Sequence, residues 1–305
     1  MSASDVFFQQ LVNGLTIGLI YALIALGYTI VYGIAQLINF AHGEIFMVGA
    51  YLGLLAYQIL KLLFPNSQEI SLFLGIIFIF SMVGTSLLGI LIERFAYRPL
   101  RNAPRLAPLI TAIGVSFLLQ NAVMLIFGPS DKSFPAIIPV KKYFFGAMIF
   151  TNLQLLIAFV SIFLMVALHL FIKYARLGKA MRALADDREA ASLMGINVNQ
   201  VISFAFLIGS GLAGAGGVMF GMYYNTINFH DGYLAGLKAF TAAVLGGIGN
   251  IPGAMIGGVL IGIFEGLGAG YFSSEWKNVF AFFILIIILL FRPSGLFGSR
   301  VVKKV

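Results

Sequence analysis

The chain of 305 residues contains no cysteine, and charged residues make up only 10% of it. Without cysteine it can form no disulfide, carry no haem-attachment motif and offer no thiol nucleophile. The shortage of charge goes with 60% apolar residues and a mean hydropathy of +1.01. These values lie outside the range of soluble domains, so the sequence is that of a membrane protein.

Long polar stretches are also missing, and none could bury a core of its own. Several apolar windows exceed the roughly 20 residues that cross a bilayer as a helix. We therefore expect an all-α polytopic membrane protein with about eight to nine transmembrane helices, forming a single transmembrane domain over 1–305. The expected spans are 6–32, 44–64, 70–92, 106–127, 153–172, 201–224, 234–248, 253–272 and 276–291.

The N-terminal segment is predicted to be the first span rather than a cleavable signal. Residues 1–5 contain no Lys or Arg, and the apolar run 6–31 is too long for the core of a signal peptide.

The net charge of +8 comes from cations in loops that border the apolar runs, which indicates contact with membrane lipid rather than nucleic acid. The segments 94–105, 173–200 and 292–305 hold 13 of the 19 Lys and Arg residues. The positive-inside rule places all three in the cytoplasm, which puts the N-terminus outside and favours nine crossings. Loop 128–152 is expected outside, either as a contact surface or as a plain connector.

Sequence signatures of enzyme chemistry are absent. There is no metal-ligand spacing, no nucleophile triad and no phosphate loop of the form G-x-x-x-x-G-K-[ST]. We expect no catalytic residue, no metal site and no cofactor on this chain.

Two glycine-rich segments interrupt the apolar runs, at 33–44 and 245–253. Non-helical backbone at membrane depth survives only against protein or a water-filled cavity, and paired broken segments are typical of inverted repeats around a central pathway. We therefore expect broken or re-entrant helices here and a possible inverted repeat, although two glycine turns at the membrane surface would give the same pattern. The predicted pathway residues are Asn39, His42, Gly43, Glu44, Gly246, Gly247, Gly249, Asn250 and Pro252.

Ionisable residues inside apolar runs mark function by default, because burying their charge is costly. His42 and Glu44 could contact a zwitterionic substrate or stabilise the bend at Gly43. Glu265 could line the pathway or face a partner subunit. Lys238 is expected to extend to the membrane interface, and His230 to lie with Asp231 in a solvated outside loop.

The longest charged interruption is the segment 173–200, which contains Glu189-Ala190-Ala191, three further residues and then Gly195. This resembles the EAA-x₃-G signature of ABC-importer permeases, whose short cytoplasmic helix docks into the ATPase subunit. Alanines would let a short helix lie close to a partner, and the glycine would let the chain turn away. An ordinary basic loop that contains EAA is the alternative.

Four stretches together resemble the LivH-type permeases of high-affinity branched-chain amino acid ABC importers. They follow one another along nearly the whole chain: YALIALGYTIVYGIAQLINFAHGEIFMVGAY (21–51), ERFAYRPLR (93–101), LGKAMRALADDREAASLMGIN (177–197) and KAFTAAVLGGIGNIPGAMIGG (238–258). One departure is the missing I-x-L-P ending after the coupling segment, where this chain has Val201-Ile-Ser-Phe204.

The resemblance implies a multi-pass permease of the bacterial inner membrane. Its partners would be a second, LivM-like permease, two cytoplasmic ATPase subunits and a periplasmic amino-acid-binding protein. The residues implied in coupling to the ATPase subunit are Gly178, Arg182, Glu189, Ala190, Ala191 and Gly195.

Three alternatives remain open from the sequence. The same importer family could carry other cargo, such as urea, short amides or other amino acids. An ion-coupled secondary amino acid transporter could use Glu44 and Glu265, but it would not need the segment 173–200. A channel would leave that segment unexplained as well.

Overall fold

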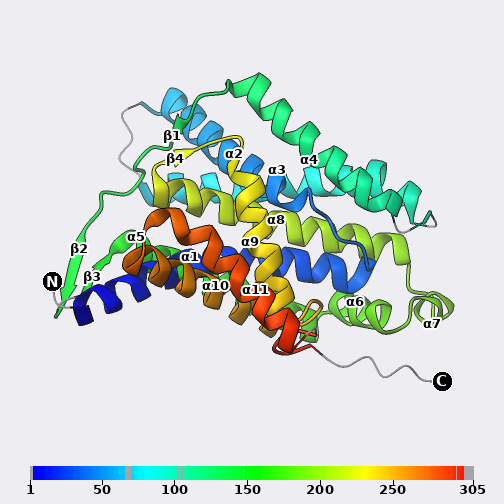
Figure 1. Cartoon of the computed structure of the whole chain (residues 1–305). Coiled ribbons are helices and arrows are strands. Elements are labelled where there is room, and N and C mark those ends of the chain that lie inside the picture. Colours follow the sequence, from blue (N-terminus) through cyan, green and yellow to red (C-terminus); the bar gives the residue numbers. More distant parts are fainter. Residues whose placement is uncertain are drawn as a thin grey trace.

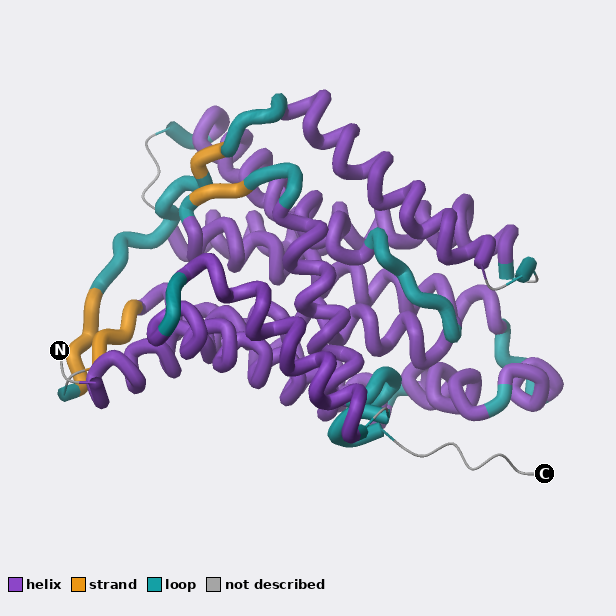
Figure 2. The backbone as a smooth tube through the Cα atoms, in the orientation of Figure 1, coloured by secondary structure: helices purple, strands orange, loops and turns teal. Residues whose placement is uncertain are grey.

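The computed structural model describes residues 3–65, 70–101, 103–104, 106–146, 148–292 and 294–298. These residues form a bundle of long helices, with two very small β-sheets at one end (Figures 1 and 2). The elements are α1 (Ala3–Ala35), α2 (His42–Leu63), α3 (Ile70–Ile92), a π-helix η1 (Glu93–Tyr97), a 3-10 turn η2 (Arg98–Leu100), α4 (Leu106–Phe127), β1 (Lys132–Ser133), β2 (Lys142–Phe145), β3 (Met148–Thr151), α5 (Asn152–Tyr174), α6 (Arg176–Asp186), α7 (Arg188–Leu193), α8 (Val198–Tyr224), β4 (Thr226–Ile227), α9 (Asp231–Gly246), α10 (Ile251–Tyr271), a 3-10 turn η3 (Ser274–Trp276) and α11 (Lys277–Phe291).

The all-α membrane class predicted from the sequence is confirmed. Among the described residues, seven helices are long and apolar enough to cross a membrane, namely α1, α2, α3 with η1 and η2, α4, α5, α8 and α10. The helix α11 is apolar but has only 15 residues, and α9 has only 16. The predicted spans 70–92 and 106–127 coincide with α3 and α4.

Among the membrane-spanning helices, α1 and α8 are the most deeply buried. Residues 20–26 of α1 are almost completely buried, and α1 packs along α10 through glycines of both helices. A Cβ atom at Gly18 would lie 2.8 Å from the carbonyl oxygen of Val259, and a Cβ atom at Gly262 would overlap the backbone of Gly18. Small residues at such crossings let helix backbones approach closely in lipid.

The connection from α1 to α2 folds back along α1. The helix ends at Ala35, and Gln36 takes the left-handed conformation with φ of 53°, which turns the chain away from the helix axis. Residues 36–41 are not helical, and α2 then starts beside the last third of α1, because the rings of His42 and Tyr28 lie 4.8 Å apart. The short helix α9 packs against α1, α2 and α10, and it crosses the long helices steeply in Figure 1.

The two ends of the bundle differ in character. Helices α6 and α7 project from one end, and the hairpin of β2 and β3 lies at the opposite end near the start of α1 (Figure 1). The two-residue strands β1 and β4 pair beside the end of α8. The basic segments predicted to be cytoplasmic share the α6–α7 end, since Arg101 bonds Asn199 at the start of α8. The cations Arg105, Arg300, Lys303 and Lys304 lie outside the described residues.

Candidate translocation and coupling sites

A large cavity of about 1130 Å³ lies at the α6–α7 end of the bundle. It is enclosed by the end of α1 with the following segment, the start of α4, the end of α5, α6, and the loop between α9 and α10. Its polar lining includes His169, Lys173 and Arg182. Three residues predicted for the pathway, Gly249, Asn250 and Pro252, line this cavity.

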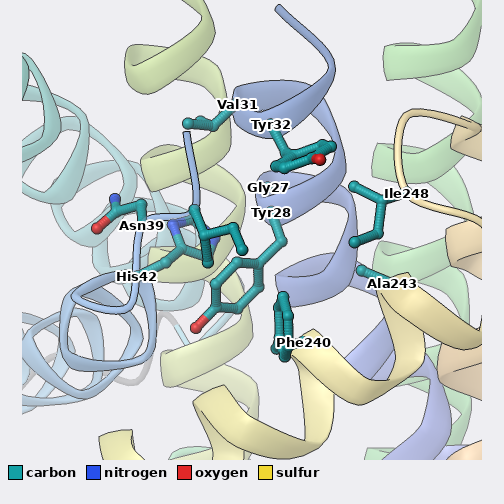
Figure 3. Close-up of a pocket in the computed structure, with 10 residues that line it drawn as sticks. Gly27, Tyr28, Val31, Tyr32, Asn39, His42, Phe240, Ala243 and Ile248 are labelled. Carbon is teal, nitrogen blue, oxygen red and sulfur yellow. The ribbon is translucent and has the colours of Figure 1, made fainter. Parts of the chain in front are cut away.

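A second, much smaller cavity of about 10 Å³ adjoins the first and is shown in Figure 3. Tyr28, Asn39, His42 and Phe240 line it, and Tyr32, Ile38 and Ile248 border both cavities. A space of this size is about that of one water molecule. Asn39 and His42, both predicted pathway residues, therefore line the small cavity and not the large one.

Asn39 is buried and holds the non-helical segment in place. Its Oδ1 atom accepts hydrogen bonds from the Tyr97 hydroxyl at 2.8 Å and from the backbone N–H of Ala41 at 3.0 Å. The Nδ2 atom of Asn39 and the Nε2 atom of His42 have no hydrogen-bond partner among the described residues. The exposed surface of the small cavity is apolar, so it offers these two atoms no polar contact.

Tyr97 belongs to a polar network that the sequence analysis missed. It ends the π-helix η1, which starts at Glu93, and such widened turns are frequent at functional sites. Glu93 is buried, pairs with Arg101 and accepts a 2.6 Å hydrogen bond from Ser203 of α8. The stretch 93–101 carried the family resemblance, but nothing in it indicated that Tyr97 reaches Asn39.

Gly43 and Glu44 lie where the starts of α2 and α9 meet. A Cβ atom at Gly43 would overlap the carbonyl oxygen of Gly232, and one at Gly236 would lie 2.8 Å from the Cα atom of Gly43. Glu44 is 1% exposed and accepts a 3.2 Å hydrogen bond from Ser116 of α4. Neither residue lines the cavities described above.

Gly246 and Gly247 serve the connection between α9 and α10. A Cβ atom at Gly246 would overlap the backbone of Gly253, and Gly247 has a φ of 101°, which favours glycine. The carbonyl oxygens of Leu245 and Gly246 accept backbone hydrogen bonds from Leu296 and Phe297. Both glycines therefore lie in close backbone packing rather than on a cavity wall.

Glu265 forms a buried ion pair with Lys238 of α9, with 2.9 Å between Nζ and Oε1. The same Nζ atom lies 3.3 Å from the hydroxyl of Tyr21 on α1. The prediction that Lys238 extends to the membrane interface is wrong, because a carboxylate on the neighbouring helix satisfies its charge inside the bundle. His230 is exposed in the turn before α9, as predicted, and its ring also contacts Gln120 of α4.

The segment 173–200 forms two short helices that are anchored to the bundle. A Cβ atom at Gly178 would overlap the end of α5, and Arg182 donates a 3.1 Å hydrogen bond to the carbonyl oxygen of Lys173. Asp187 caps α7 by accepting from the N–H groups of Glu189 and Ala190. Gly178 and Arg182 thus fold α6 back on α5.

The EAA motif forms α7 itself. Ala191 is 4% exposed and faces this chain, whereas Glu189 and Ala190 are exposed. Gly195 has a φ of 82° and ends the helix. The apolar side chains of Leu193 and Met194, which the sequence analysis did not single out, are 87% and 84% exposed at the tip.

Among the described residues, no group of three or more His, Cys, Asp or Glu side chains could hold a metal ion. The features that remain are long apolar helices, a large cavity at one end and a short projecting helix beside it. Together they define a multi-pass membrane transport permease.

The comparisons with known proteins agree with that class. Residues 10–289 match the family described as "Branched-chain amino acid transport system / permease component". The chain is similar to the high-affinity branched-chain amino acid transport system permease proteins BraD of Pseudomonas aeruginosa, with 49% identity, and LivH of Escherichia coli K12, with 46% identity, each over 98% of both chains. The permease protein LivM of Salmonella typhimurium is 24% identical over 92% of this chain and 68% of its own. No solved structure gives a significant match.

The chain belongs to this family of branched-chain amino acid transport permeases. It is a non-catalytic, membrane-spanning component of an ABC transport system.

Proposed function

We propose that this chain is one of two permease subunits in an ATP-driven importer of leucine, isoleucine and valine in the bacterial inner membrane. A periplasmic amino-acid-binding protein delivers the substrate, and a second, LivM-like permease completes the membrane part. Two cytoplasmic ATPase subunits bind ATP and Mg²⁺, while this chain binds no cofactor. The names of the relatives support the cargo and the system.

The observation that supports this proposal most directly is the exposed tip of the projecting helix α7. Its tip exposes Leu193 and Met194 in an otherwise polar segment, and exposed apolar groups of this kind are typical of protein contact sites. The permease therefore docks on an ATPase subunit through α7, with Glu189 and Ala190 on the exposed side. The anchoring of α6 by Gly178 and Arg182, and of α7 by Ala191 and Gly195, keeps the contact rigid.

The translocation route follows the cavities inward from the α6–α7 end. Gly249, Asn250 and Pro252 line its wide part, and Asn39 and His42 lie where it narrows. Residues of the non-helical segments 36–41 and 247–250 line these cavities, and we assign the two segments to the broken helices of an inverted repeat. Gly43, Gly246 and Gly247 hold the helices around the route, and Glu265 fixes α9 through Lys238.

The orientation of the chain in the membrane follows from the proposed contact of α7 with a cytoplasmic ATPase subunit. The α6–α7 end faces the cytoplasm, and the β2–β3 hairpin within 128–152 faces outside. With α9 and α11 counted as short crossings, the chain passes the membrane nine times.

The cargo is tested with the complete complex, purified with both permeases and both ATPase subunits. ATP hydrolysis is measured with the binding protein and one candidate ligand at a time. We expect leucine, isoleucine and valine to stimulate hydrolysis several-fold, and urea or acetamide to have no effect. Stimulation by urea or an amide, and none by leucine, would refute the cargo while leaving the importer mechanism intact.

A further inference from the structure

A cluster of polar side chains lies on the face formed by α4 and the start of α9, and the cavities above do not account for it. Its members are Glu44, Ser116, Gln120 and His230. Ser116 lies at the middle of α4, ten residues after Leu106 and eleven before Phe127. A helix of 22 residues is about 33 Å long, close to the thickness of the hydrocarbon layer, so Ser116 lies near the membrane midplane.

Only one of the two carboxylate oxygens of Glu44 accepts a hydrogen bond from the described residues. Its Oε1 atom accepts the bond from Ser116, and its Oε2 atom has no partner among the described residues although Glu44 is 1% exposed. A Cβ atom at Gly232 would overlap this oxygen, so the first turn of α9 covers it. An intramembrane carboxylate with a free oxygen is costly and marks a functional site.

Gln120 and His230 lie one helical turn further out, about 6 Å along α4. The Nε2 atom of Gln120 lies 2.7 Å from Nδ1 of His230. With the amide nitrogen as the donor, Nδ1 accepts and the one ring proton of the neutral imidazole is on Nε2. His230 is exposed, and its Nε2–H group is then available to an acceptor outside the chain.

Lipid does not cover the whole of this face. Phe117 and Leu118 of α4 are exposed apolar side chains that suit lipid, as are Phe159 and Phe163 at the middle of α5. Gln120 is half-buried, and His230 is exposed in the turn before α9. We place this outer end of the cluster in contact with water, because hydrocarbon would offer the imidazole no hydrogen bond.

We propose that this cluster is a contact site for the zwitterionic head of the transported amino acid, an inference that rests on the proposed function. The free oxygen of Glu44, opened when the first turn of α9 moves aside, accepts the α-ammonium group. The imidazole N–H of His230, held by Gln120, donates to the α-carboxylate. Ser116 and Gln120, which contact the two anchors, lie one turn of α4 apart, about 6 Å along the helix axis.

Introduced cysteines test this site directly, because the chain has none of its own. Ser116→Cys and Gln120→Cys place a thiol at the cluster. Phe163→Cys is the matched control, since Phe163 lies at the middle of α5 and is 60% exposed on an apolar face. Each variant is assembled into the full complex in proteoliposomes, and the rate of modification by a small hydrophilic thiosulfonate reagent is measured.

We expect Gln120→Cys and Ser116→Cys to react several-fold faster than Phe163→Cys. Leucine-loaded binding protein with ATP should slow their modification several-fold, and unloaded binding protein with ATP should not. Rates equal to that of Phe163→Cys would show that the face is not aqueous, and rates unaffected by leucine would show that no amino acid binds there. Either result overturns the site.

The ATPase activity of the unmodified complex distinguishes a failure of the contact site from a failure of the proposed function. If leucine-loaded binding protein stimulates its ATPase activity and the cysteines are not protected, only the contact site fails. If leucine gives no stimulation, the proposed function itself fails. As a second variant, Glu44→Gln keeps the size of the side chain and removes its charge, and it should abolish protection of Gln120→Cys without changing the rate measured in the absence of leucine.

Discussion

The hydroxyl of Tyr97 donates a 2.8 Å hydrogen bond to Oδ1 of Asn39 and so joins the π-helix at the end of α3 to the non-helical segment before α2. The other end of this π-helix is Glu93, which bonds Ser203 near the start of α8. The helix α8 follows directly on α7, the proposed docking helix. A continuous set of hydrogen bonds and packed helices thus connects the proposed docking helix with the narrow part of the proposed route.

Loss of this bond should weaken energy coupling. In Tyr97→Phe the ring remains but Oδ1 of Asn39 loses a donor, at a cost of about 1 kcal/mol. We expect normal membrane abundance and reduced leucine uptake at unchanged basal ATP hydrolysis. Tyr143→Phe, on the exposed β2 strand, serves as the control. Unchanged uptake per permease in Tyr97→Phe would show that the bond has no part in transport.

The ion pair of Lys238 and Glu265 should matter for stability more than for substrate selection. Removing one partner of a buried pair leaves an uncompensated charge and costs about 3–5 kcal/mol. Glu265→Gln and Lys238→Met should therefore lower the amount of folded permease in membranes. The double variant Lys238→Met with Glu265→Gln should recover part of it, because no charge remains unpaired. Quantitative blotting and detergent thermal shift measure this, and equal losses in single and double variants would contradict the pairing.

Replacing a glycine of the interrupted segments should reduce transport more than replacing a glycine with open space around it. Gly43 packs against Gly232, and Gly249 lies at the large cavity with a φ of 94°. Gly43→Leu and Gly249→Leu should abolish uptake measured at equal membrane abundance. Gly75→Leu is the control because no atom lies within 4 Å of its Cβ position. Gly18 is unsuitable as a control since it packs on α10. Full activity of Gly249→Leu would remove that residue from the route.

The predicted sidedness can be checked with single cysteines. Asp187→Cys should be protected from an impermeant thiol reagent in intact cells, since 173–200 is placed in the cytoplasm by its cations. Phe144→Cys, on the exposed hairpin strand β2, should react. The reverse pattern would invert the topology.

Much of this fold follows from hydropathy alone. The bounds of α3 and α4 match the predicted spans because apolar runs of bilayer length start and end sharply there. The two glycine-rich interruptions correctly located the non-helical segments beside the cavities. They did not separate residues on a cavity wall, such as Gly249, from residues in backbone packing, such as Gly246, because both require the absence of a side chain.

Contacts between distant parts of the chain could not be predicted. Lys238 and Glu265 are 27 residues apart on helices joined by a turn, and only the antiparallel packing of α9 and α10 brings their charges together. The bond of Tyr97 to Asn39 spans 58 residues and depends on a π-helix that has no simple sequence signal. The exposure of Leu193 and Met194 was hidden as well, because apolar residues next to a glycine turn are usually buried.

The docking role of α7 is the central claim, and ATP hydrolysis by the assembled complex tests it most directly. Leu193→Arg places a charge on the exposed tip without filling space inside the chain, and Ala190→Trp adds bulk on the same side. We predict that leucine-loaded binding protein stimulates ATP hydrolysis in the unmodified complex but not in either variant, although both variants insert into the membrane at normal abundance. Normal stimulation in both would contradict the account, because the ATPase subunit would then have to engage the permease elsewhere.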